Sequence, residues 1–294
     1  MVGKNLVSSL EKEYDIFAPS RQELDLLNFK KTNDYIKNTQ PDIIIHCAGK
    51  VGGIQANINN PFEFFDINLK IGQSIINAAM NNGISNFLNL SSSCIYRPDS
   101  KTPLKEESIL TAGLEKTNEG YALAKISILK YCEYISKQHN LFFKTIIPCN
   151  LYGDHDKFDS VKSHLIPAII LKIDNAIKSK QKEVEIWGDG TAKREFMYVG
   201  DLVNFIHYFL KNFQKMPFKL NVGVEKDYSI NEYYNVIGKI MGYAGTFIHN
   251  LDKPVGMKRK KVDISKLNEV GWKSSISLNE GVKKTISFYE KNKV

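Results

Sequence analysis

A tyrosine and a lysine four residues apart are the first side chains in this sequence that suggest a chemical reaction. Tyr121 and Lys125 lie in the stretch YALAK, whose periodicity is helical, so the two side chains share one face of a helix. Ser92 lies about thirty residues earlier, in SSSCIY. A phenol with an ordinary pKa of about 10 is a sluggish acid or base near neutrality, but a neighbouring ammonium stabilises its anion. Together with a hydroxyl that hydrogen-bonds a substrate oxygen, these groups favour the reduction of a carbonyl.

The tyrosine–lysine pair alone is weak evidence, because the sequence is rich in both residues. It contains 14 tyrosines and 36 lysines among 294 residues, so chance predicts about two pairs with this spacing. Tyr289 and Lys293 form a second pair, which we interpret as coincidence. The alternative interpretation of Tyr121 and Lys125 is also a coincidence: an ordinary surface tyrosine and lysine on an amphipathic helix. The serines that precede it at the end of a predicted strand favour the catalytic interpretation.

Short apolar runs alternate with helical patterns over the first half of the chain. This alternation is typical of parallel strands joined by crossover helices, so we predict an α/β fold with a Rossmann-type, doubly wound parallel sheet. The pattern loosens after about residue 151, which predicts a smaller C-terminal substrate-binding lobe. The expected strands cover 15–18, 41–49, 86–93 and 142–150, and the expected helices cover 22–37, 62–82 and 119–138.

The chain is expected to divide near residue 151. Residues 1–151 should form a dinucleotide-binding domain to which part of 195–215 returns, and 152–294 should form the substrate-binding domain. A helical pattern starts directly after Gly3, which we interpret as the third glycine of a G-x-x-G-x-x-G dinucleotide-binding motif. The first strand of the sheet would stand before this glycine, so we expect that strand to be missing from the sequence as written.

The composition argues against several other classes of protein. The net charge of +8 comes from lysines scattered along the chain, which is typical of a solvated surface and not of a nucleic-acid interface. The longest apolar run, 165–171, is too short to span a membrane, and no signal segment begins the chain, so a cytoplasmic protein is expected. The four cysteines are far apart and the six histidines are scattered, so neither a disulfide framework nor a metal site is expected.

Longer motifs indicate a family. The sequence resembles the GDP-L-fucose synthase family, a branch of the extended short-chain dehydrogenases/reductases, over its whole length. The motifs that carry the resemblance are AGKVGGIQAN (48–57), SSSCIY (91–96), TNEGYALAK (117–125), NLYGDHDKF (150–158), SHLIPA (163–168), WGDGTAKREF (187–196), LNVG (220–223) and GW (271–272).

The resemblance implies two chemistries on one substrate. It predicts NADPH-dependent 3,5-epimerisation and 4-reduction of GDP-4-keto-6-deoxy-D-mannose to GDP-L-fucose, with Ser92, Tyr121 and Lys125 as the reductive triad. Cys94 and His164 match the acid/base pair for epimerisation, because a 4-keto group acidifies the protons on C3 and C5. Without the resemblance, Cys94 would be a small core residue and His164 a solvent-facing residue at a helix start. The alternatives are an epimerase or reductase of a related nucleotide sugar and a non-catalytic NADP-binding relative.

The cofactor is expected to be NADP(H). Arg21 follows the second predicted strand, where an arginine accommodates a 2′-phosphate and a carboxylate would favour NAD. The alternative is an ordinary basic residue at a helix start. The full set of expected cofactor-binding residues is Gly3, Arg21, Leu90, Ser91, Ser92, Ser93, Lys125, Pro148, Cys149, Asn150, Leu151 and His164.

The expected substrate is a GDP-sugar. The family pattern assigns substrate contacts to Lys172, Trp187, Arg194 and Arg259, where cations suit a diphosphate and an aromatic ring suits a base or sugar. Val255 stands where the family commonly has an acidic residue, so the sugar nucleotide is left open. A homodimer that binds neither nucleic acid nor membrane is also expected.

Overall fold

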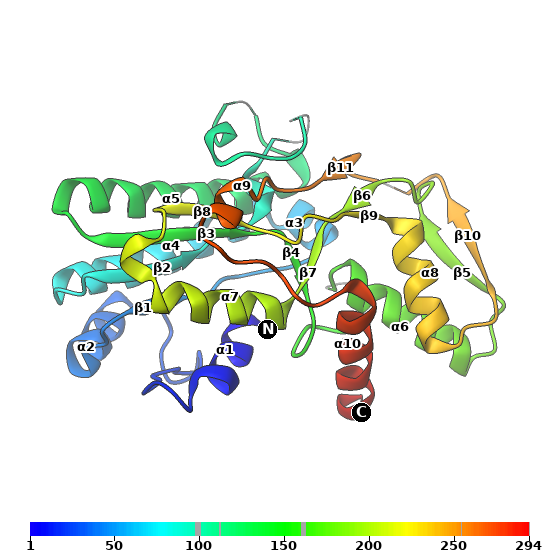
Figure 1. Cartoon of the computed structure of the whole chain (residues 1–294), viewed down its shortest axis with the longest axis horizontal. Coiled ribbons are helices and arrows are strands. Elements are labelled where there is room, and N and C mark those ends of the chain that lie inside the picture. The colour runs from blue at the N-terminus through cyan, green and yellow to red at the C-terminus, as the bar shows by residue number, and fades with distance from the viewer. Residues whose placement is uncertain (98–100, 112, 160–162, 254, 294) are drawn as a thin grey trace.

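Four parallel strands form the central sheet of the molecule. The computed structural model describes residues 1–97, 101–111, 113–159, 163–253 and 255–293. Neighbouring strands in the sheet follow the order β1-β2-β3-β8, and every pair is parallel. The strands are β1 (Ile44–His46), β2 (Asn86–Leu90), β3 (Phe142–Pro148) and β8 (Lys219–Val222) (Figure 1).

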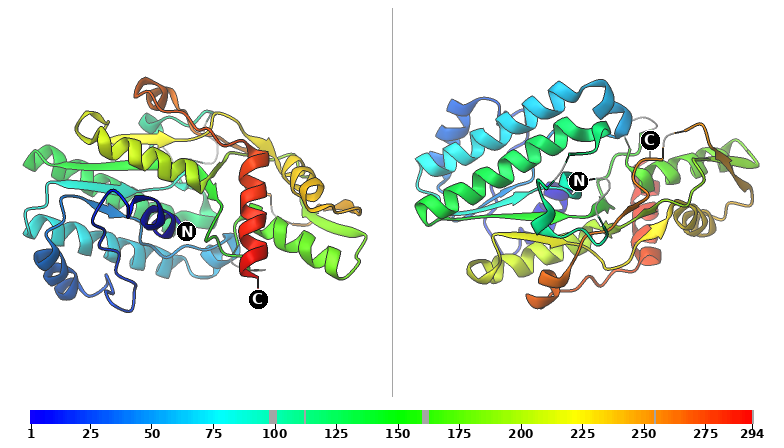
Figure 2. Two further views of the ribbon diagram at one scale, coloured as in Figure 1. Left: turned by 60° about the horizontal axis from the view of Figure 1, so that its bottom comes forward. Right: turned by 90° about the horizontal axis from the view of Figure 1, so that it is seen from above.

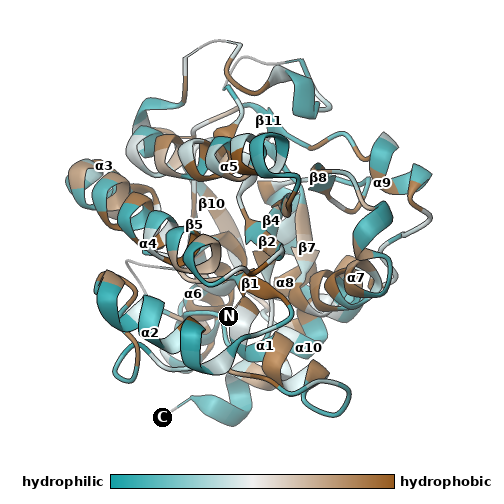
Figure 3. Ribbon diagram, turned by 90° about the vertical axis from the view of Figure 1, so that its left-hand side faces the viewer, coloured by the Kyte–Doolittle hydropathy of each residue, from teal (hydrophilic) through white to brown (hydrophobic). Residues whose placement is uncertain are grey.

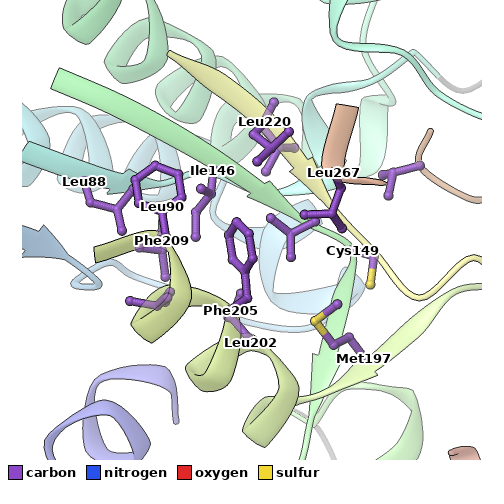
Figure 4. Close-up of a cluster of buried hydrophobic side chains, with 14 of the residues drawn as sticks. Leu88, Leu90, Ile146, Cys149, Met197, Leu202, Phe205, Phe209, Leu220 and Leu267 are labelled. Carbon is purple, nitrogen blue, oxygen red and sulfur yellow. The ribbon is translucent and has the colours of Figure 1, made fainter. Parts of the chain in front are cut away.

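Helices cover both faces of this sheet, because alternate strand residues are apolar on each side. On one face, α4 (Pro61–Asn81) and α5 (Glu119–His139) pack on Phe87 and Phe143, and α2 (Phe29–Thr39) adds Ile36. On the other face, α1 (Val2–Leu10) and α7 (Val199–Lys211) pack on Leu88 and Ile146. Figure 4 shows this second core, and Figure 3 shows the helices around the sheet. The predicted doubly wound α/β fold is confirmed.

Two predicted elements differ from the structure. Residues 15–18 are not a strand, because no strand in the described ranges pairs with them. The helix predicted for 22–37 begins at Phe29, after the N-cap Asn28, whose side chain accepts the N–H of Lys31. The preceding residues form turns instead: the N–H of Leu27 donates to the side chain of Asp25 at 3.1 Å. Short polar side chains that bond to nearby backbone groups compete with the helix.

The second lobe is built from three helices and several short strands. The helices α6 (Leu165–Lys178), α8 (Ile230–Met241) and α10 (Leu278–Asn292) enclose a separate apolar core. Figure 2 shows α10, in red, between the central sheet with its helices and the rest of the second lobe. The strand pairs are β4 (Asn150–Tyr152) with β7 (Phe196–Tyr198), β5 (Glu183–Trp187) with β10 (Thr246–Asn250), and β6 (Lys193–Arg194) with both β9 (Tyr228–Ser229) and β11 (Arg259–Lys260).

The chain crosses between the lobes more than once. The predicted division at residue 151 falls inside β4, and α7, β8 and the short helix α9 (Ser265–Glu269) return to the sheet side of the molecule. The remaining short elements are α3 (Ile54–Asn59) and the 3₁₀ turns at Ser93–Ile95, Glu106–Ser108, Lys116–Asn118 and Phe213–Lys215.

The second tyrosine–lysine pair has a structural role. The hydroxyl of Tyr289 donates to Asp174 at 2.7 Å, and the ammonium of Lys293 lies 3.1 Å from the same carboxylate. Both residues therefore fasten the C-terminal part of the chain to α6.

None of the helices in the described ranges combines the length and the hydropathy that crossing a membrane requires.

The loop between β5 and β6 depends on Gly190. Its φ is +70°, and a Cβ at this position would lie 1.9 Å from Oδ1 of Asn231, whose N–H donates to the carbonyl of Gly190 at 3.0 Å. Gly242 is a matched control, because its φ is +69° and a Cβ there would meet nothing within 4 Å. This loop leads from Trp187 to Arg194, so its shape affects the substrate lobe.

We expect Gly190→Ala to lower the free energy of unfolding by more than Gly242→Ala does. The left-handed backbone alone costs about 1–2 kcal/mol at either position, and the collision with Asn231 adds about 1–3 kcal/mol only at Gly190. Urea unfolding of both variants measures the difference. Equal losses would show that the loop relaxes around the new methyl group.

Candidate active site

Ser92 and Cys94 lie in the turn that follows β2. Ser92 is the N-cap of a short 3₁₀ turn, and its Oγ accepts the backbone N–H of Cys94 at 3.4 Å. The Cys94 side chain is buried, with 7% of the residue exposed. Burial raises the pKa of the Cys94 thiol, whereas Lys260, the Ser92 hydroxyl and Lys125 lower it. The turn therefore presents a hydroxyl and a thiol at one strand end.

Tyr121 and Lys125 come to the same strand end from the first turns of α5. The ammonium of Lys125 donates a hydrogen bond to the carbonyl of Leu90 at 2.9 Å and lies 5.8 Å from the centre of the Tyr121 ring. Burial, followed by the charge on Cys94, raises the pKa of Tyr121 above its ordinary value. Burial also lowers the pKa of Lys125. The phenol therefore holds its proton in this site and can act as an acid.

These four side chains form one electrostatic cluster. Cys94 influences the pKa of both Tyr121 and Lys125, although the three residues come from two different elements. The sequence reasoning expected the lysine to stabilise a phenolate. In the structure the Lys125 ammonium is held by Leu90, so it would stabilise that anion from a short distance without a direct hydrogen bond. A proton donor, a thiol and a hydroxyl thus come together at the end of β2.

His164 lies apart from this cluster. It is the N-cap of α6 in the second lobe, and its side chain is exposed. Within the described ranges, no hydrogen bond joins His164 to Ser92, Cys94, Tyr121 or Lys125. The structure therefore brings together four of the five predicted catalytic residues and places the fifth on the other lobe.

Several predicted cofactor residues converge at the carboxyl ends of the strands. Gly3 in the first turn of α1 lies beside Cys47, which follows β1: a Cβ on Gly3 would lie 3.8 Å from that of Cys47. Ser91 continues β2, and its N–H donates to the carbonyl of Ile146 at 2.9 Å. The side-chain oxygen of Ser91 is buried and has no partner in the described structure. Pro148 ends β3, and Cys149, Asn150 and Leu151 continue toward the second lobe.

Asn68 is a positioning residue that the sequence reasoning missed. Its Oδ1 accepts the N–H of Lys50 at 2.9 Å, and its Nδ2 donates to the carbonyls of Lys50 and Phe64 at 3.0 and 2.7 Å. A Cβ at Gly49 would lie 2.8 Å from this Oδ1 and 3.9 Å from the Lys125 ammonium. Asn68 thus fixes the loop after β1 beside Lys125. A polar residue on the apolar face of α4 was the signal available in the sequence.

Arg21 stands on the surface near the start of the chain. It lies in a turn, its side chain is 79% exposed, and its guanidinium is 4.0 Å from the carboxylate of Asp25. An exposed pair at this distance contributes little to stability. The guanidinium is therefore accessible to an anion.

Trp187 and Lys172 line an open groove of about 810 Å³ beside β5. The Lys172 ammonium lies 5.5 Å from the centre of the Trp187 ring and donates to the carbonyl of Glu185 at 3.0 Å. Lys253 also lies 5.6 Å from that ring, which the sequence reasoning did not foresee. An aromatic ring with two ammonium groups close to it suits a flat, electron-rich group or an anion.

Arg194 and Arg259 lie on opposite faces of the strand pair β6–β11. In the parallel pair of β6 with β11, Lys260 is opposite Arg194 and Arg259 is opposite Lys193. The guanidinium of Arg259 binds both carboxylate oxygens of Asp227, at 2.5 and 2.9 Å. Arg194 donates to the carbonyls of Lys193 and Val255. The cation that shares a face with Arg194 is therefore Lys260, which strand alternation could have indicated.

Glu195 fastens these strands together. It is completely buried, and its two carboxylate oxygens accept the N–H groups of Val224 at 2.8 Å and Val262 at 2.9 Å. Its carbonyl accepts the side-chain amide of Asn150 at 2.9 Å. Burial raises the pKa of this carboxyl to about 7. Glu195 therefore joins the end of the sheet to the strands that carry Arg194 and Lys260.

The sequence matches known proteins over nearly all of its length. The pattern of the NAD dependent epimerase/dehydratase family matches residues 1–223. A GDP-L-colitose synthase of Yersinia pseudotuberculosis is 52% identical, over 99% of this chain and 96% of that protein. A GDP-L-fucose synthase of Azorhizobium caulinodans is 43% identical, over 98% of this chain and 93% of that protein.

Solved structures give the same picture. A GDP-6-OMe-4-keto-L-xylo-heptose reductase from C. jejuni superposes with a TM-score of 0.92 at 28% identity, over 99% of this chain and 94% of that one. A GDP-mannoheptose C4 reductase from Campylobacter jejuni, solved with NADP bound, gives 0.89 at 28% identity, over 98% and 95%. The site geometry, the family pattern and these relatives agree: the chain belongs to the NAD dependent epimerase/dehydratase family and is a GDP-L-fucose synthase-like member of it.

Proposed function

We propose that this enzyme uses NADP(H) to epimerise GDP-4-keto-6-deoxy-D-mannose at C3 and C5 and to reduce C4, which gives GDP-L-fucose. The observation that carries the proposal is the cluster of Ser92, Cys94, Tyr121 and Lys125 at the end of β2. A reductase alone needs the hydroxyl, the phenol and the ammonium. The thiol in the same cluster supplies a group for proton transfer at carbon.

The residues around the strand ends fit a dinucleotide. The unpartnered oxygen of Ser91 and the Lys125 ammonium supply polar contacts, and Gly3 and Gly49 allow close approach of the backbone. Bound NADPH would supply a hydride to the C4 carbonyl. Leu90, Ser93, Pro148, Cys149, Asn150 and Leu151 would line this site.

The reductive step follows from the protonation state of Tyr121. Its raised pKa keeps the phenol protonated, so Tyr121 donates its proton to the C4 oxygen as that oxygen gains negative charge. Ser92 would hydrogen-bond the same oxygen and hold it beside the phenol. The ammonium of Lys125, 5.8 Å from the ring centre, then stabilises the phenolate that remains.

Epimerisation needs a base and an acid on separate elements. The 4-keto group acidifies the protons on C3 and C5, and each inversion removes a proton from one face and returns one to the other. We assign this exchange to two groups, Cys94 in the turn after β2 and His164 at the N-terminus of α6. Their location on different lobes supports approach from different sides of a substrate held between the lobes.

The GDP portion is assigned to the second lobe. Arg194 would bind the diphosphate, because its guanidinium is fixed by two carbonyls and a guanidinium matches phosphate oxygens bidentately. Trp187 and Lys172 would contact the base or the sugar along their groove. Arg259, which is paired with Asp227, receives no support for a substrate contact from this geometry.

A second candidate is favoured by the 52% identity to the GDP-L-colitose synthase. L-Colitose lacks the C3 hydroxyl of L-fucose, so a substrate of that type has no stereocentre to invert at C3. The two functions are separated by incubating the protein and NADPH with GDP-4-keto-6-deoxymannose and with its 3-deoxy analogue. Product NMR and kcat/KM for each decide between them. Preference for the 3-deoxy sugar would replace the fucose assignment, and turnover of neither would remove both.

We also propose a homodimer in the cytoplasm. The outer surface of α4 and α5 carries exposed apolar side chains, with Phe62 73%, Tyr134 59% and Leu123 39% exposed. A shallow groove of about 260 Å³ between Leu69 and Tyr131 continues this surface. Light scattering should give twice the chain mass of 33.4 kDa, and a monomeric mass at micromolar concentration would contradict the proposal.

Tyr121→Phe and Cys94→Ser should separate the two chemistries. Tyr121→Phe removes the proton donor, so C4 reduction should fall by about 10²–10⁴-fold while deuterium from D₂O still enters C3 and C5. Cys94→Ser should do the reverse and lower deuterium exchange more than hydride transfer. Proton NMR of the sugar in D₂O and NADPH absorbance follow the two processes. Equal losses of both processes in each variant would show that the two residues do not have separate roles.

Arg21→Ala should weaken NADPH much more than NADH, because only NADPH carries the additional phosphate. A charge-assisted hydrogen bond of this kind contributes about 1.5–3 kcal/mol, which corresponds to roughly 10- to 100-fold in Kd. Titration calorimetry with both cofactors measures it, and Lys12→Ala, at another exposed basic residue, is the control. The same loss for NADH and NADPH would rule out Arg21 as the phosphate contact.

A further inference from the structure

The hydroxyl of Tyr121 makes no hydrogen bond within the ranges that the structure describes. A proton donor needs a free hydroxyl to reach a substrate oxygen, so the orientation of this phenol has to come from contacts along its ring. The Lys125 ammonium, 5.8 Å from the ring centre, and the apolar core that contains Leu90 supply two such contacts.

Phe64 supplies a third contact, from the first turn of α4. The rings of Phe64 and Tyr121 are edge-to-face, with their centroids 6.4 Å apart and their planes at 82°. Aromatic pairs favour this arrangement, because the positive edge of one ring meets the negative face of the other. Only 2% of Phe64 is exposed, whereas Tyr121 is partly exposed. One side of the phenol therefore lies against a buried aromatic ring.

The loop after β1 packs on the Phe64 ring. A Cβ at Gly52 would lie 3.0 Å from Cζ of Phe64, so the backbone of this loop lies close to the tip of the ring. The Lys50 ammonium lies 5.4 Å from the ring centre. Asn68 bonds the backbone of Lys50 and the carbonyl of Phe64, which ties the loop to α4. The Phe64 ring is therefore held between this loop and the start of α5.

The start of α5 lies equally close to α4. A Cβ at Gly120 would lie 2.4 Å from the carbonyl oxygen of Pro61 and 3.5 Å from Cβ of Phe65. A side chain at this position would need one of the two helices to shift, because packed interiors leave no spare room. Gly120 therefore allows the close approach that brings Tyr121, the next residue, against Phe64.

We propose that Phe64 is a positioning residue for Tyr121: its buried ring holds the phenol at a fixed angle while the hydroxyl stays free for the C4 oxygen of the sugar. Phe64 itself takes no part in proton or hydride transfer. This inference rests on the proposed function for the role of Tyr121, but the contact between the two rings can be tested without substrate.

The first test is the effect of Phe64→Leu on the two chemistries. Leucine keeps the position apolar and removes the ring. We expect kcat for C4 reduction to fall by about 10- to 100-fold, because small misplacements of a reacting group cost rates of this size. The KM for the GDP-sugar, the Kd of NADPH and deuterium exchange at C3 and C5 should change little, since Phe64 acts through Tyr121 alone.

Phe143→Leu is the matched control. Phe143 is also fully buried, and its ring packs on that of Phe87 with centroids 5.1 Å apart, in the core between the sheet and the helices α4 and α5. Both variants should melt at a lower temperature than the parent protein. Only Phe64→Leu should have a lower kcat, which separates positioning from a general loss of packing.

The second test needs no substrate. NMR relaxation of tyrosines labelled with ¹³C in the ring measures how much each ring moves, and the Tyr121 signal is identified by its absence in Tyr121→Phe. We expect the order parameter of the Tyr121 ring to fall in Phe64→Leu and to stay at the parent value in Phe143→Leu.

Gly120→Ala is a second variant, for the case that Phe64→Leu does not fold. Its methyl group should displace the start of α5 and loosen the Tyr121 ring while the Phe64 ring is kept. Gly72→Ala is the control for this variant, because a Cβ at Gly72 would lie 2.4 Å from Cδ1 of Ile128, further along the same pair of helices.

A Tyr121 ring that is as ordered in Phe64→Leu as in the parent overturns the proposal. An unchanged kcat, or an equal loss of kcat in Phe143→Leu, overturns it as well. A mobile ring in Phe64→Leu alone supports it even if the enzyme reduces no GDP-4-keto sugar, in which case the proposed function fails and the Phe64–Tyr121 contact stands. The same criteria apply to Gly120→Ala and its control.

Discussion

The candidate site depends on one buried ammonium. Lys125 donates to the carbonyl of Leu90 at 2.9 Å, and this bond joins the start of α5 to the end of β2. A charge in a low-dielectric interior is costly unless it is hydrogen-bonded, so the lysine favours the arrangement that brings this carbonyl to it. Tyr121 lies one turn earlier on α5, and Ser92 and Cys94 come directly after Leu90. Loss of this contact would separate the phenol from the hydroxyl and the thiol.

The second lobe is tied to the same strand ends by a second buried group. Glu195 accepts backbone N–H groups of Val224 and Val262, and its carbonyl binds Asn150. The strands β6 and β11, which carry Arg194 and Lys260, are therefore fixed relative to the end of β3. In parallel sheets, ligands bind beyond the carboxyl ends of the strands, and here both lobes contribute cations to that region. A GDP-sugar and a dinucleotide could thus meet over Cys94 and Tyr121.

The sequence predicted the parts of this arrangement that have strong local signals. The alternation of apolar runs and helical patterns predicted the doubly wound sheet, and the YALAK and SSSCIY motifs predicted which side chains meet at β2. The helix predicted for 22–37 was placed to begin too early. Residues 19–28 contain turns, and the side chains of Asp25 and Asn28 bond to nearby backbone N–H groups there. Asn68 and Glu195 were missed because their roles depend on tertiary contacts between distant segments. His164 falls in the segment predicted to form the second lobe, but its exposure and its lack of a hydrogen bond to the cluster in the described residues depend on the packing of α6, which no local pattern encodes.

The central claim is that one cleft performs proton exchange at carbon and hydride transfer on the same sugar. The most direct test is the isotope pattern of the product formed from GDP-4-keto-6-deoxymannose in two incubations. The first uses D₂O and unlabelled NADPH. The second uses H₂O and NADPH that is deuterated at the transferred position. The account predicts solvent deuterium at C3 and C5 with protium at C4 in the first case, and deuterium at C4 alone in the second. Cofactor deuterium at C4 without solvent deuterium at C3 or C5 would make the enzyme a reductase only and contradict the account.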